Sequence, residues 1–222
     1  AIPMFFMVWI ISGLFLPAFL SLIIIFTAGF LFAAVAGYMA GIVGSSNNPL
    51  SGVTIIVVIL TATTFALLNS LVYGGENTAE LQVAVIGVAA FVACAGAISG
   101  DNLQDLKTGY LLGATPWKQQ LMQLVGVVSA ALTLGIVLTL LHEAYGIGSS
   151  DLPAPQAVLM TNVANGVFAG NLEWGMIYAG AILGIIIILI DQYQAYRKAD
   201  FRVPILAVAI GIYLPIELTL PI

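Results

Sequence analysis

Residues 19–43 read FLSLIIIFTAGFLFAAVAGYMAGIV, a run without one charged side chain. A helix needs about 20 apolar residues to cross the hydrocarbon core of a bilayer, so this run predicts a membrane-spanning helix. Comparable runs predict further spans at residues 53–69, 81–99, 121–141, 172–190 and 203–220. A shorter run at residues 2–16, which Pro17 interrupts, predicts one more span. No alternation of apolar and polar residues indicates barrel strands. We therefore expect an all-α, polytopic transmembrane helix bundle with broken or re-entrant segments.

The composition supports a membrane protein and excludes other classes. Hydrophobic residues make up 61% of the 222 residues and charged residues 7%, against roughly 25% charged residues in soluble domains. Five Lys and Arg residues are too few for a nucleic-acid surface. One cysteine, Cys94, excludes an intramolecular disulfide and a cysteine metal cluster. We expect a multi-pass protein of the cell (inner) membrane, with no metal site and no cofactor.

The cations predict the orientation of the spans. They lie in two connections, with Lys107 and Lys118 in the first and Arg197, Lys198 and Arg202 in the second. The positive-inside rule places both connections in the cytoplasm. The spans then alternate correctly only if residues 153–170 do not cross the membrane, so we expect a re-entrant or surface-lying segment there.

Glycines predict close helix packing. Pairs four residues apart form a flat helix face that lets two backbones approach closely. Ala33, Gly37 and Gly41 extend this pattern over two turns, whereas chance explains some of the pairs at Gly96/Gly100, Gly109/Gly113, Gly166/Gly170 and Gly180/Gly184.

Two uncharged polar segments interrupt the apolar sequence. Residues 44–52 contain Asn47 and Asn48, and a segment beginning at Pro153 contains Gln156, Asn162 and Asn165. Such segments are either ordinary turns and interhelical contacts or breaks that line a substrate cavity, as in many transporters. On the second interpretation, both segments meet around one cavity and their amides bind substrate.

A third polar segment, residues 100–109, contains two acids with two amides between them, Asn102 and Gln104. On a helix Asp101 and Asp105 share one face, and they repel each other when both are ionised. One of them could therefore carry a proton, unless the segment is a solvated loop. Lys107 could instead pair with Asp105 if the helix broke at Gly109. Glu217, two residues after Pro215 in an apolar run, is a third candidate.

The motifs resemble one family. They are GSSNNPLSG at 44–52, GDNLQDLKTG at 100–109 with GATPWKQQ at 113–120, PAPQ at 153–156 and YLP at 213–215. This order is similar to the oligopeptide transporter family, whose plant branch includes yellow-stripe-like metal–nicotianamine transporters. The most specific part is GDNLQDLKTG.

The resemblance implies a proton-driven secondary transporter that imports peptides or metal–chelate complexes, with this chain as a C-terminal part of the transporter domain. Its expected partners are that small substrate, transported protons and the lipid bilayer, with a homo-oligomer left open. Asn102 and Gln104 join the candidate substrate-binding amides, and the candidate proton carriers are, in order, Glu217, Asp101 and Asp105.

Two other functions compete with transport. A channel could also use glycine-rich broken helices. An intramembrane aspartyl protease needs Gly-x-Gly-Asp, whereas Ile98, Ser99 and Gly100 precede Asp101. A serine protease would have to use His142 at a span end, with no Gly-x-Ser-x-Gly motif nearby. We therefore expect no enzyme.

Overall fold

The computed structural model describes residues 1–45, 48, 50–198, 203, 208, 211 and 212. Seven helices occur in this part of the chain, and no strand occurs there. Their bounds are α1 Ile2–Ser12, α2 Phe15–Val43, α3 Leu50–Val72, α4 Thr78–Leu112, α5 Pro116–Tyr145, α6 Pro155–Ala169 and α7 Trp174–Tyr196.

Five of these helices (α2, α3, α4, α5 and α7) are long and apolar enough to cross a membrane. A helix satisfies its own backbone N–H and C=O groups, which lipid cannot do, so apolar sequence of this length folds as a helix. The expected all-α transmembrane bundle is confirmed.

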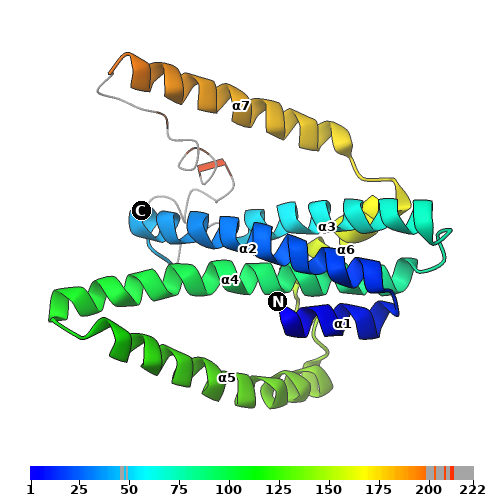
Figure 1. Ribbon diagram of the computed structural model, residues 1–222, viewed down its shortest axis with the longest axis horizontal. Coiled ribbons are helices and arrows are strands. Elements are labelled where there is room, and N and C mark those ends of the chain that lie inside the picture. The colour runs from blue at the N-terminus through cyan, green and yellow to red at the C-terminus, as the bar shows by residue number, and fades with distance from the viewer. Residues whose placement is uncertain (46–47, 49, 199–202, 204–207, 209–210, 213–222) are drawn as a thin grey trace. The chain divides into compact units, whose positions relative to one another are not determined.

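The chain divides into two compact units, residues 1–171 and residues 172–222. In the first unit α2 packs along α4, with α1 and α3 beside them and α6 against α3 and α4 (Figure 1). In the second unit the described helix is α7.

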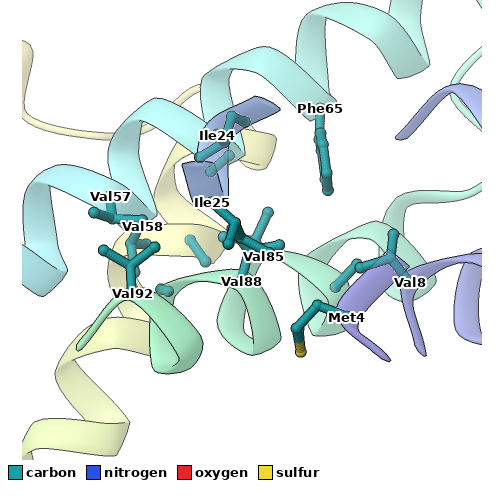
Figure 2. Close-up of a cluster of buried hydrophobic side chains, with 14 of the residues drawn as sticks. Met4, Val8, Ile24, Ile25, Val57, Val58, Phe65, Val85, Val88 and Val92 are labelled. Carbon is teal, nitrogen blue, oxygen red and sulfur yellow. The ribbon is translucent and has the colours of Figure 1, made fainter. Parts of the chain in front are cut away.

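The core of the first unit is aliphatic. Val57 and Val58 of α3 meet Val85, Val88 and Val92 of α4, and all five are fully buried (Figure 2). Ile24 and Ile25 of α2 and Met4 and Val8 of α1 complete the same cluster. In a lipid environment such packing stabilises by close van der Waals contact rather than by removal from water.

The first expected span, residues 2–16 with a break at Pro17, differs from the structure. Helix α1 ends at Ser12, and Gly13 adopts a left-handed conformation with φ 66°. Pro17 lies in the first turn of α2, where its missing N–H needs no partner. The chain therefore breaks at glycine, which tolerates positive φ, and not at proline.

Helix α4 runs well past the expected span at 81–99. It continues through the polar segment 100–109 to Leu112 and ends at Gly113, which has φ 74°. At 35 residues it is about 52 Å long. The polar segment is therefore a helical part of the α4–α5 hairpin, not a loop. Most of the expected span 203–220 lies outside the described residues.

Candidate functional site

The break between α2 and α3 lies against α4. Gly44, with φ 81°, ends α2, and the backbone N–H of Ser45 donates a hydrogen bond of 2.7 Å to Oε1 of Gln104 on α4. Asn48 Nδ2 donates to the backbone oxygen of Ala36 at 3.3 Å. Asn47 lies outside the described residues. Two of the predicted substrate-binding amides, Asn48 and Gln104, thus bind backbone groups at this break.

Small residues allow α2 and the α2–α3 break to pack closely against α4. The Oγ of Ser99 donates to the Ala33 oxygen at 2.7 Å, and a Cβ on Gly37 would lie 3.0 Å from that Oγ. A Cβ on Gly100 would lie 2.9 Å from Nδ2 of Asn48, whereas one on Gly41 would meet nothing within 4 Å. Ala33 and Gly37 therefore belong to the α2–α4 contact, and Gly41 does not.

A cavity of about 320 Å³ lies among α3, α4 and α6. It combines residues from the two uncharged polar segments with apolar residues of α4: Leu50, Ser51, Thr54, Ile86, Ala89, Ala90, Gln156, Ala157, Met160 and Thr161. The structure thus brings the start of α3 and the start of α6 together, as in the cavity interpretation. Of the three predicted amides in α6, Gln156 lines this cavity, while Asn162 and Asn165 are exposed and are not among its lining residues.

The polar segment of α4 faces α5. Gln123 Nε2 donates to Oδ2 of Asp105 at 2.8 Å, and Gln119 Nε2 donates to the Asp105 backbone oxygen at 3.2 Å. The helix does not break at Gly109, and Lys107 Nζ lies 5.3 Å from the ring centre of Tyr110. The condition for a Lys107–Asp105 pair is therefore not met.

Two further cavities flank this contact, and Gln123 lines both. One, of about 500 Å³, includes Ser99, Asn102 and Gln120. The other, of about 610 Å³, includes Asp105, Lys118 and Gln119. The side-chain oxygen of Asn102 is buried and accepts no hydrogen bond from the described residues.

The structure describes two of the three candidate proton carriers. Asp101 and Asp105 are exposed side chains of α4, and Glu217 lies outside the described residues. Among the described residues, no three His, Cys, Asp or Glu side chains gather where they could hold a metal ion.

Sequence reasoning missed Thr54, Thr161 and Gln123. Thr54 lies inside an apolar stretch and carries no motif, whereas Thr161 directly precedes the predicted amide Asn162. Gln123 had a detectable signal, because it follows Gln119 by one helical turn and an antiparallel partner would align both with Asp105.

Comparison with known proteins identifies the family. The family described as "OPT oligopeptide transporter protein" matches residues 1–222. A Haemophilus influenzae protein named "Putative oligopeptide transporter" is 39% identical over 208 residues, which cover 87% of this chain and 33% of the relative. An Oryza sativa subsp. japonica protein named "Probable metal-nicotianamine transporter" is 29% identical over 163 residues, covering 69% of this chain and 23% of the relative.

The chain thus spans a third or less of the length of these two relatives. No solved structure matches it. The family match extends over every residue of the chain and agrees with the helical, apolar architecture. The chain therefore belongs to the OPT oligopeptide transporter family.

Proposed function

We propose that this chain is part of a proton-coupled secondary transporter that moves oligopeptides or peptide-like metal chelates across the cell membrane. The family match supports transport. The names of the two relatives support both substrate classes, because one is called an oligopeptide transporter and the other a metal-nicotianamine transporter.

One structural observation carries the proposal. Residues from two uncharged breaks in apolar sequence, at the starts of α3 and α6, line the same cavity of about 320 Å³. Transporters commonly build substrate sites from interrupted helices, whose free polar groups face a cavity. This volume falls within the roughly 300–1,000 Å³ of typical ligand pockets.

The candidate carriers for proton coupling are three acidic side chains. Asp101 and Asp105 flank Gln104, whose side chain reaches Ser45 just after the apolar helix α2 ends. Both acids lie within α4, which is long and apolar enough to cross a membrane, and ionisable groups inside such helices are functional candidates by default, since desolvation makes them expensive. We rank Glu217 before Asp101 and Asp105.

Reconstitution in liposomes tests transport. We expect uptake of a labelled tripeptide or of a metal–nicotianamine complex, and exchange of labelled for unlabelled substrate against a gradient. Gln156→Ala should weaken this uptake while expression stays intact, because Gln156 lines the cavity. A channel would dissipate the gradient and show no counterflow, and that result would contradict the proposal.

Neutral variants test proton coupling. Replacing the carrier, by Glu217→Gln, Asp101→Asn or Asp105→Asn, should abolish substrate accumulation driven by a pH gradient. Exchange should survive, because it needs no net proton movement. If all three variants still accumulate substrate, none of these acids carries the proton.

A further inference from the structure

Two threonines line the cavity among α3, α4 and α6, and the hydroxyl group of each already donates a hydrogen bond to its own helix. Thr54 Oγ1 donates to the backbone oxygen of Leu50 at 2.8 Å, and Thr161 Oγ1 donates to the backbone oxygen of Ala157 at 2.9 Å. A hydroxyl has one proton and two lone pairs. Each hydroxyl can therefore act only as an acceptor toward a ligand in the cavity.

The remaining lining is neutral. None of the residues around this cavity carries a charge, and Ile86, Ala89, Ala90 and Met160 supply apolar walls. Gln156, an exposed side chain, is the one amide in the lining and can both donate and accept. A charged group placed in such a site loses water without gaining an opposite charge. The cavity thus suits a neutral ligand with N–H donors and an apolar side chain.

We propose that this cavity binds a neutral peptide backbone segment, with Thr54 and Thr161 accepting from its amide N–H groups. Gln156 pairs with an amide of the same segment, and Ile86 and Met160 contact its apolar side chain. The assignment rests on the proposed transport function and narrows it, because the site favours peptides over charged metal chelates. Thr54 and Thr161 become specificity-determining residues.

Equilibrium binding to the purified protein in detergent tests the site directly. The probe is a labelled acetyl-dileucine amide, which is neutral and carries backbone N–H groups. Thr54→Val and Thr161→Val preserve side-chain shape but remove the acceptor. Each should weaken binding about fivefold, the value of one neutral hydrogen bond. Thr64→Val is the matched control, since Thr64 on the same helix also donates to its own helix, at 2.7 Å to Leu60, and lies outside the cavity lining.

The wild-type protein provides a second test that needs no variant. An analogue methylated at its backbone nitrogens should bind at least fivefold more weakly, and neither threonine variant should weaken it further. A metal–nicotianamine complex should not displace the labelled probe. Unchanged binding in both threonine variants, equal binding of the methylated analogue, or absence of probe binding would overturn the proposal. Probe binding without any uptake would contradict transport and leave this site standing.

Discussion

At the scale of single residues, Asn48 and Gly100 determine how the α2–α3 break packs against α2 and α4. The Asn48 amide donates a hydrogen bond to the Ala36 oxygen, and a Cβ at position 100 would lie 2.9 Å from the donating nitrogen. Its side-chain oxygen is buried without a partner in the described part of the chain. Displacing this amide from Ala36 costs free energy, because the Nδ2 hydrogen bond offsets part of the cost of burying the side chain.

Gly100→Ala should therefore destabilise the protein, whereas Gly41→Ala should not. The added methyl group at 100 forces the Asn48 amide away from Ala36, at a cost of about 1–3 kcal/mol. At position 41 the methyl group meets nothing within 4 Å, and alanine favours the helix by up to about 1 kcal/mol. Thermal unfolding in detergent measures the difference. Asn48→Ala should remove most of the penalty at 100, and equal stability of the two glycine variants would contradict the contact.

At the scale of elements, the α4–α5 hairpin determines where the polar segment 100–109 lies. Helix α5 has no buried side chain within the unit of residues 1–171. Its described polar contacts with α4 are those of Gln119 and Gln123 with Asp105. Gly109 lies directly against the Gln119 side chain. One glycine and two glutamines therefore form the described polar contact between these two helices.

Gly109→Ala should open the hairpin. A Cβ at this position occupies the space of the Gln119 side chain and displaces its bond to the Asp105 backbone. Pulsed EPR between spin labels at the exposed positions Ile98 and Val128 should show a longer and broader distance distribution. Gly126→Ala on α5 is the control, because a methyl group there meets nothing within 4 Å. An unchanged distribution in Gly109→Ala would show that this contact does not hold the hairpin.

At the scale of the whole molecule, the topology depends on which connections share a membrane face. The end of α4 and the start of α5 meet at one end of the hairpin (Figure 1). Lys107 belongs to the last turns of α4 and Lys118 to the first turn of α5. Helix α6 has 15 residues and a length of about 22 Å, less than the roughly 30 Å hydrocarbon core. That length fits the prediction that residues 153–170 do not cross.

Cysteine labelling in a Cys94→Ser background tests this topology. A membrane-impermeant maleimide should reach Ser150→Cys and Asn171→Cys from the outside. It should reach Ala114→Cys only from the cytoplasmic face, because the positive-inside rule places the two hairpin lysines there. Labelling of Ser150→Cys and Asn171→Cys from opposite faces would show that α6 crosses the membrane and would refute the re-entrant segment.

The sequence by itself determined the class of fold, because apolar runs without charges can satisfy their backbone in lipid only as helices. It also located the polar interruptions at Asn48, Gln104 and Gln156, since each stands out against its apolar surroundings. The first break was misplaced at Pro17, because nothing local shows that a left-handed Gly13 ends α1 four residues earlier.

Only the tertiary structure decided what each polar group faces. Asn48 and Gln104 bind backbone at the α2–α3 break, whereas Gln156 shares a cavity with Thr54, a residue about a hundred positions away. Local sequence shows that a side chain is polar and which helix face carries it. Its partner depends on helix register and crossing, which follow from the sum of packing contacts along α2, α3, α4 and α6.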